Sequence, residues 1–206
     1  MARALTPTDL AAEPTAALTS LLAGNRRFAT GRPRHGHRHT EAGREPVQRP
    51  YALLLGCLDS RVVPESIFDL DFGEVMVVRT GGHVIDAAVL GSIDFAVNTM
   101  RVPLLMVLGH QYCGAVAVTI SALREGTRPT GPIGYLADQI APAVGELVHG
   151  TADVVDEVVR RHVAATVDRL SALSLVQNQV QAGALAVVGA HYQVDNGQVD
   201  LVPATT

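Results

Sequence analysis

Short apolar runs recur along the chain, and longer stretches with helical spacing separate them. The first run, "YALLLGC", is apolar at almost every position, as is typical of a strand buried on both faces. Three further runs, "EVMVVRT", "PLLMVLGH" and "ALAVVGAHY", also have the length of a strand. We therefore predict four strands, at residues 51–57, 74–80, 103–110 and 184–192.

Between these runs, apolar residues recur every three or four positions, which predicts amphipathic helices. In the last such stretch, Val155, Val159, Val163 and Val167 follow this spacing. Proline near the start of "VPESIFDL" and glycine at the end of "SALREG" are typical helix boundaries. The predicted helices cover residues 16–31, 63–70, 85–100, 114–126, 135–149 and 151–182.

Strands that alternate with helices predict a parallel sheet between layers of helices. The dipeptide Asn196-Gly197 predicts a hairpin that adds an edge strand after the last parallel strand. The fold class is therefore α/β, with a central, mostly parallel four-stranded sheet flanked by helices and an added C-terminal edge strand or hairpin. A chain of 206 residues fits one domain. We expect a single domain over 1–206, with an N-terminal helical arm and loop at 1–50 and an α/β core at 51–206.

The composition excludes several classes of protein. With 48% hydrophobic and 17% charged residues, the chain is globular and not disordered. A net charge of −4 and 4% aromatic residues give no basis for nucleic-acid binding. The apolar runs are too short to span a membrane, and the N-terminus lacks the apolar segment of a signal peptide. We expect a cytoplasmic protein with no membrane partner.

Polar residues with metal-binding chemistry follow two of the predicted strands. Cys57 ends the first strand in "CLDSR", His110 ends the third, and Cys113 follows in "GHQYCGAV". If these strands are neighbours, the three side chains converge at the carboxyl edge of the sheet, where such folds carry their chemistry. Two thiolates and an imidazole are strong zinc ligands, and a helix N-terminus at Cys113 favours its thiolate. A disulfide is disfavoured in a reducing cytosol.

The fourth ligand position decides what such a zinc site could do. Asp59 could fill it and close the site. Arg61 could instead hold the Asp59 carboxylate in a bidentate pair and leave the position open to water. A plain ion pair that orients the loop is the simpler alternative. Zinc with two thiolates and a neutral histidine is formally neutral, so hydroxide should form at alkaline pH and activity should rise with pH.

These motifs resemble those of the bacterial β-class carbonic anhydrases. The resemblance runs from "LLAGNRRF" to "LAVVGAHYQVDNG", and C-x-D-S-R and G-H-x-x-C-G are its most specific parts. It implies a carbonate dehydratase, a zinc lyase that reversibly hydrates CO₂ to bicarbonate and a proton by zinc-bound hydroxide. It implies Zn²⁺ on Cys57, His110 and Cys113, with water or Asp59 as fourth ligand, and the Asp59–Arg61 pair as a gate.

The resemblance also implies a homodimer or homotetramer, in which Gln48 reaches the substrate site, often across the dimer interface. We expect Gly82 and Gly114 to contact substrate as well. Leu58 replaces a serine of many members, and we expect its side chain to point away from the alternating Cys57, Asp59 and Arg61. Leu54 replaces the tryptophan of the bicarbonate-inhibited subgroup, so we do not expect that inhibitory site in its usual form.

Two alternatives stay open at this point. The same scaffold could hydrolyse CS₂ or COS, because these linear molecules resemble CO₂ and suit the same nucleophile. A zinc site closed by Asp59 would instead be non-catalytic.

The remaining histidines are expected to be structural. His35, His37 and His39 fall in a polar segment that we interpret as a solvated loop and not as a metal or proton-shuttle site. For His83 we expect a loop hydrogen bond and not a proton relay. His162 lies on an otherwise valine-rich helix face and should be partly buried.

Overall fold

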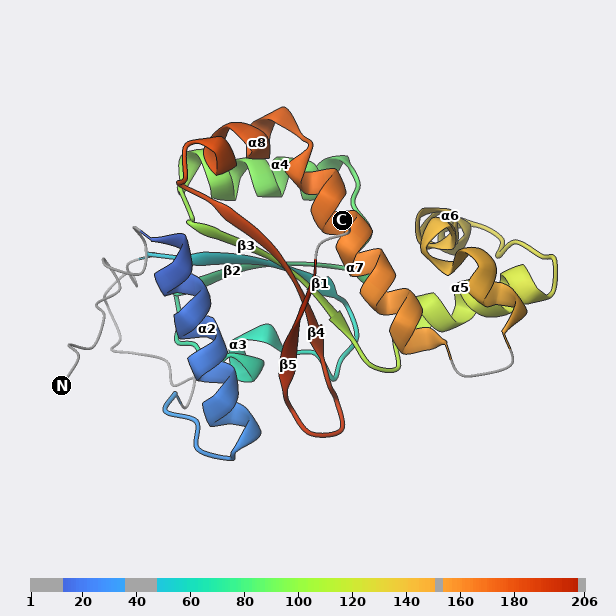
Figure 1. The fold of residues 1–206 in the computed structure, drawn as a ribbon, viewed down its shortest axis with the longest axis horizontal. Coiled ribbons are helices and arrows are strands. Elements are labelled where there is room, and N and C mark those ends of the chain that lie inside the picture. Colours follow the sequence, from blue (N-terminus) through green and yellow to red (C-terminus); the bar gives the residue numbers. More distant parts are fainter. Residues whose placement is uncertain (1–12, 36–47, 151–153, 204–206) are drawn as a thin grey trace.

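The computed structural model describes residues 13–35, 48–150 and 154–203 (Figure 1). Its centre is a five-stranded sheet with the strand order β2-β1-β3-β4-β5. Four strands are parallel, and β5 pairs antiparallel with β4. The predicted fold class, a mostly parallel four-stranded sheet with an added C-terminal edge strand, is confirmed. The strands are β1 (Ala52–Cys57), β2 (Val75–Thr80), β3 (Leu104–His110), β4 (Ala186–Tyr192) and β5 (Val199–Val202).

The two central strands explain the apolar runs in the sequence. Every residue of β1 and β3 is buried, because helices cover both faces of the sheet and a strand lies on each side. Strand β2 lies at an edge and is only partly buried. The register pairs Gly56 with Leu108, so β1 and β3 end side by side.

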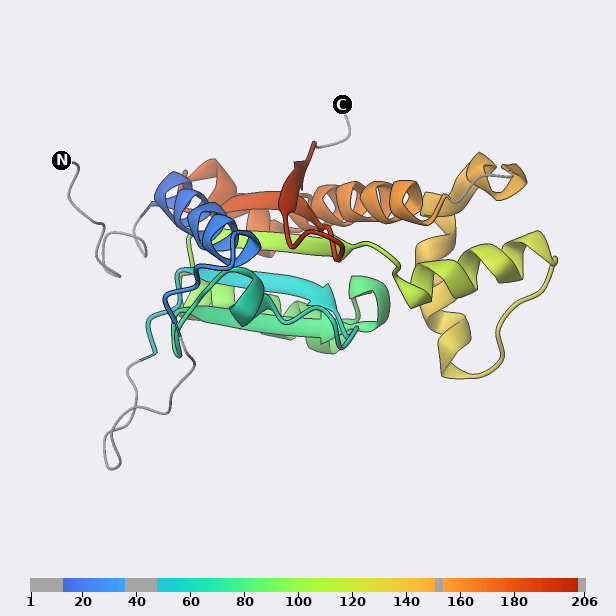
Figure 2. The same ribbon diagram turned by 90° about the horizontal axis from the view of Figure 1, so that it is seen from below.

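Seven α-helices lie within the described residues, and most pack on the sheet. Helices α2 and α3 cover one face, while α4, α7 and α8 cover the other. Helices α5 and α6 project beyond the carboxyl ends of β1 and β3 (Figure 2). Their bounds are α2 (Pro14–Ala29), α3 (Pro64–Ile67), α4 (Ala87–Asp94), α5 (Gly114–Arg124), α6 (Pro132–Val144), α7 (Val155–Ser171) and α8 (Ser174–Gln181).

Three short segments of other helical types complete the fold: η1 (Gly81–His83), η2 (Phe95–Thr99) and η3 (Gly145–His149). The predicted helix at 85–100 is shorter than expected. It begins at Ala87, where the Asp86 side chain accepts a hydrogen bond from Val89 N, and passes into the π-helical η2.

The prediction of one helix over 151–182 is wrong, because the described part of this stretch forms two helices. Leu173 between them is extended, with φ −74° and ψ 131°. The break lets α8 turn back onto η2, where Asn98 Nδ2 donates to Leu175 O at 3.1 Å and accepts from Gln179 at its own Oδ1. Helical periodicity alone does not register such a break, since both halves keep the spacing.

The predicted hairpin joins β4 to β5, but its loop is longer than a two-residue turn. Gly197 has φ 76° and donates its N–H to Gln193 O at 2.8 Å. The buried Asn25 of α2 holds the loop: its Nδ2 donates to Gly197 O at 2.8 Å, and its Oδ1 accepts from Val199 N at 2.9 Å. The N-terminal helix is thereby tied to the C-terminal hairpin.

None of the helices in the described ranges is long and apolar enough to cross a lipid bilayer. The division into an arm at 1–50 and a core at 51–206 stays a prediction. In the part predicted as the arm, Ala17 and Leu21 of α2 are fully buried against the sheet.

Candidate active site

Cys57, His110 and Cys113 meet where β1 and β3 end. Cys57 is the last residue of β1, His110 is the last residue of β3, and Cys113 is the N-cap of α5. The expectation that these two strands are neighbours is confirmed, and it explains the convergence. The ligand atoms of the three side chains lie within 4.8 Å of one another, and all three residues are buried.

The donor chemistry of this cluster fits a zinc ion. His110 Nδ1 lies 2.7 Å from Gln111 O, and since a carbonyl can only accept, Nδ1 carries the proton. The other ring nitrogen, Nε2, is buried without a hydrogen-bond partner among the described residues. A neutral imidazole with a free Nε2 beside two sulfur atoms is a ligand set that zinc prefers, with the second nitrogen fixed by an outer hydrogen bond.

The two thiols are close enough to affect each other's pKa. The hydrogen bond from Cys113 is the largest effect that lowers the pKa of Cys57 to about 4, and burial opposes it. The same contact raises the pKa of Cys113. Gly82 N also donates to Cys57 Sγ, at 3.4 Å. The Cys57 sulfur therefore faces a backbone donor from the loop after β2 as well as the Cys113 sulfur.

Asp59 and Arg61 form a bidentate pair at the rim of the cluster. Arg61 Nε donates to Oδ1 at 3.0 Å and Nη2 donates to Oδ2 at 2.7 Å, while Arg61 N donates to Oδ1 as well. These hydrogen bonds are the main cause that lowers the pKa of Asp59 to about 2. Arg61 Nη2 also donates to Tyr112 O at 3.1 Å, which links the loop after β1 to the segment between His110 and Cys113.

Arg79 supports the same loop from β2, a role that the sequence analysis missed. Its Nε donates to Cys57 O at 2.9 Å and its Nη2 donates to Asp59 O at 2.6 Å. The signal available in the sequence was its place one residue before the end of a strand that turns out to pair with β1. Arg79 fixes the backbone that carries both Cys57 and Asp59.

A cavity of about 260 Å³ opens beside the cluster and is lined by Cys57, Asp59 and residues of α5 and α6. Its walls are mostly apolar, with Val118 from α5 and Leu136 from α6. Gly114 lies on this lining, as a substrate contact would require. Leu58 lines the cavity too, and it is largely exposed. The sequence analysis gave α6 no part in the site.

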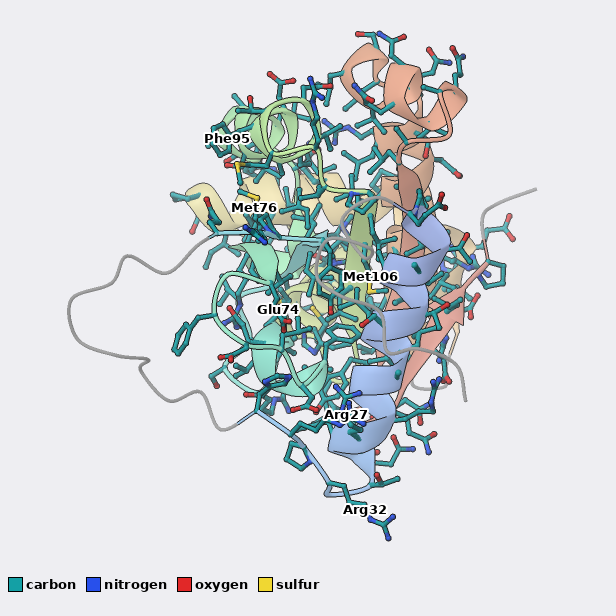
Figure 3. All side chains as sticks on the ribbon, turned by 90° about the vertical axis from the view of Figure 1, so that its left-hand side faces the viewer. Arg27, Arg32, Glu74, Met76, Phe95 and Met106 are labelled. Atoms are coloured by element: carbon teal, nitrogen blue, oxygen red, sulfur yellow. The ribbon has the colours of Figure 1, made fainter. Side chains whose placement is uncertain are left out.

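Unlike Gly114, the other two predicted substrate-binding residues, Gly82 and Gln48, do not line the cavity. Gly82 is next to the cluster through its contact with Cys57 Sγ, although it does not line the cavity. Gln48 is exposed and lines a separate groove of about 560 Å³ along the edge strand β2, together with Met76 and Phe95. Figure 3 shows Met76 and Phe95 on the same side of the molecule. Within one chain, Gln48 is therefore not brought to the cavity beside Cys57.

The other histidines fall into two groups. His83 and His162 are buried and their rings stack on each other, and their roles stay predictions. His35 lies with its Nδ1 3.7 Å from Asp71 Oδ2. His37 and His39 lie outside the described residues.

Comparisons with known proteins point in one direction. A family model described as carbonic anhydrase matches residues 52–199. "Carbonic anhydrase 2" of Mycobacterium tuberculosis is 44% identical over 191 residues, which cover 91% of this chain and 92% of the relative. The carbonic anhydrase of Mycolicibacterium smegmatis is also 44% identical, over 91% and 93% of the two chains. The solved structure of a β-carbonic anhydrase from Coccomyxa in complex with acetazolamide has a TM-score of 0.70 and 26% identity, and covers 90% of this chain and 86% of that chain.

Proposed function

We propose that Cys57, His110 and Cys113 hold the zinc ion of this protein. The chain belongs to the β-class carbonic anhydrase family and reversibly hydrates CO₂ to bicarbonate and a proton. The observation that carries the proposal is the mutual distance of at most 4.8 Å among their three ligand atoms, all of them buried. The unpartnered Nε2 of His110 supports the proposal further. When bound, zinc would supply a Lewis acid that acidifies a water molecule and makes it nucleophilic, increasingly so as pH rises.

We propose that Arg61 holds Asp59 away from the metal, so that the fourth position stays open. Both carboxylate oxygens of Asp59 accept hydrogen bonds from Arg61, and Asp59 is not a member of the three-residue ligand cluster. A shut arrangement, with Asp59 as fourth ligand, would require this pair to separate. The Asp59–Arg61 contact is therefore the gate of the site.

With the pair intact, Asp59 would act as a hydrogen-bond acceptor for the attacking nucleophile. Its pKa of about 2 means that it stays ionised at every functional pH. Such a carboxylate orients a donor but does not store the proton that the reaction releases. We therefore propose that Asp59 aims the nucleophile and that the proton leaves to the solvent.

The apolar walls of the cavity suit the substrate. CO₂ is small, linear and uncharged. Val118 and Leu136 offer it an apolar surface to which water binds poorly. We propose that Gly114, on the cavity wall, borders the bound substrate directly. We propose that Gly82 acts on the substrate site indirectly, through its contact with Cys57. The relatives at 44% identity are carbonic anhydrases, which favours CO₂ hydration over CS₂ or COS hydrolysis and over a closed non-catalytic site.

The assembly is proposed to be a homodimer that pairs further into a tetramer, with contact along the β2 edge. This edge has no neighbouring strand in the described chain, and Phe95 beside it is 49% exposed. Gln48 lies in the same groove, so a second copy seated there could receive it at its own cavity. Phe95→Asp should lower the mass measured by light scattering, whereas Phe72→Asp, at an exposed phenylalanine in a different groove, should leave it unchanged.

Two free cysteines in the described residues suit a reducing compartment, so we also propose that the protein is cytoplasmic.

The direct test is stopped-flow CO₂ hydration, followed with a pH indicator from about pH 7 to 9, on protein of measured zinc content. We expect activity that rises with pH and is proportional to bound zinc. One zinc ion per chain without hydration anywhere in this range would contradict the proposal.

A further inference from the structure

His162 connects the long helix α7 to the loop beside the metal ligands. Its Nε2 lies 3.0 Å from Gly82 O. Because a carbonyl oxygen can only accept, Nε2 must carry the proton. Burial lowers the pKa of His162 to about 4, so the ring is neutral at physiological pH and keeps this donor. The contact is therefore a hydrogen bond from α7 to the loop η1.

His83 completes the connection from the opposite side. Its ring stacks on that of His162, with centroids 4.4 Å apart and an interplanar angle of 28°. Burial is the main cause that lowers the pKa of His83 well below its usual value, and the neighbouring His162 adds to it. His162 thus binds the backbone of η1, and His83 contacts α7 through its ring. We call this pair, His83 and His162, the histidine clamp.

The loop that the clamp holds has an unusual backbone. Gly82 has φ 61° and ψ 31°, and His83 follows with φ 48°. Two successive residues are therefore left-handed, a conformation that glycine adopts easily and histidine rarely does. Such a segment keeps its shape only where the surroundings determine it. On the side of α7, the histidine clamp holds the backbone of Gly82 and His83 in this conformation.

The geometry of this loop reaches the proposed metal site. Gly82 N donates to Cys57 Sγ at 3.4 Å, while Gly82 O accepts from His162. The two groups lie in the peptide planes on either side of one Cα atom, so the carbonyl contact restrains the φ and ψ angles that set the direction of the N–H. Helix α7 is a firm support, since Val158, Val159 and Val163 around His162 are buried in the core.

We propose that His162 is a positioning residue for the Cys57 sulfur and acts through Gly82. The inference rests on the proposed function, because it assumes that Cys57 binds zinc. The N–H of Gly82 orients the sulfur and satisfies part of its negative charge. Outer hydrogen bonds of this kind are worth about 10–100-fold in metal affinity or activity.

Zinc affinity, measured by competition with a chromogenic chelator, tests the proposal without relying on turnover. His162→Leu keeps much of the volume but removes the donor, and should weaken zinc binding about 10–100-fold. His162→Gln keeps an N–H donor at a similar reach and should recover most of the affinity. Val167→Ala, at a buried position further along α7, should lower the melting temperature and leave zinc affinity unchanged.

The outcomes distinguish the positioning role of His162 from zinc binding itself. Wild-type affinity in folded His162→Leu, or an equal loss in Val167→Ala, would overturn the positioning role while zinc and activity in the wild type stand. Wild-type protein that binds no zinc would overturn both.

If His162→Leu does not fold, the wild-type protein still provides a test. The Nε2 proton of His162 should be visible by NMR and should shift when zinc is removed with a chelator. A resonance that does not respond to zinc removal would contradict the coupling.

Discussion

Arg61 donates two side-chain hydrogen bonds to Asp59, from Nε to Oδ1 at 3.0 Å and from Nη2 to Oδ2 at 2.7 Å. A planar guanidinium matches a carboxylate in this way, and a lysine ammonium does not. The pair is nearly half exposed on its arginine side, so its role is one of orientation more than stability.

Removing the guanidinium should therefore impair turnover and spare the metal. We expect Arg61→Ala to lower kcat/KM for CO₂ hydration by roughly 100-fold while zinc content stays near one per chain. Arg61→Lys should recover little, because it lacks the fork. Arg161→Ala, which breaks the exposed Arg161–Glu157 pair on α7, is the control and should keep full activity. Near-normal turnover in Arg61→Ala would remove the gating role.

Exchanging a ligand sulfur for oxygen should have the opposite pattern. Cys57→Ser should lose most zinc and, in proportion, most activity, because a serine hydroxyl is not ionised at neutral pH and binds zinc poorly. Metal analysis and stopped-flow assays on the same preparation measure both. Full zinc occupancy in Cys57→Ser would show that this sulfur is not a ligand.

Gly82→Ala should fold poorly for two separable reasons. A Cβ there would meet Ile140 Cδ1 at 2.8 Å and Ala115 Cβ at 3.3 Å, and φ is positive. Gly31 has a similar φ with open space around it, so Gly31→Ala measures the backbone cost alone, about 1–2 kcal/mol. Urea unfolding should give a larger loss for Gly82→Ala than for Gly31→Ala. Equal losses would mean that the neighbours yield easily.

Acid should weaken the fold through buried histidines. Burial is the main reason that the pKa of His191 falls from 6.5 to about 4, with Arg160 adding to it and Asp156 opposing it. The unfolded chain then binds more protons than the folded chain between these pH values. Stability is complete above pH 6.5 and declines as pH falls toward 4, by on the order of 3 kcal/mol for this residue.

Chemical denaturation at pH 7 and pH 4.5 measures this decline. His191→Leu should reduce the difference between the two pH values, although His162, with a pKa also lowered to about 4, keeps part of it. A variant whose stability changes with pH as steeply as that of the wild type would assign the acid sensitivity to other groups.

Asn25 should be worth more than its place on α2 suggests. Its amide donates to Ile67 O at 3.2 Å and to Gly197 O at 2.8 Å and accepts from Val199 N. Asn25→Ala leaves one buried and two partly buried backbone groups without this partner, so we expect a loss of about 2–4 kcal/mol in the free energy of unfolding. Thr19→Ala, on the exposed side of the same helix, should cost less than about 1 kcal/mol.

The sequence predicted those parts of the fold that local patterns determine. The buried strands are continuous apolar runs, and parallel pairing of β1 with β3 then brings Cys57 and His110 to one edge. Parts that depend on distant partners were missed. Arg79 donates to the backbone of a neighbouring strand, and Asn25 donates to a hairpin at the far end of the chain. Leu136 forms part of the cavity wall. None of these contacts leaves a periodic signal.

The break between α7 and α8 illustrates the same limit. Its cause is the fit of α8 against η2, which periodicity does not contain. Gln48 is a different case, since its predicted place at the substrate site involves a second copy of the chain.

The adjacency of β1 and β3 also bears on how the protein is made. The strand that ends in Cys57 pairs with one that ends at His110, and β2 and α4 intervene in the chain. During synthesis, the two sulfurs and the imidazole come together only after this crossover has been completed and docked. Non-local parallel pairing is slow relative to helix formation. Metal uptake is therefore expected to follow assembly of the sheet, so that the rate of zinc incorporation would time a late step in folding.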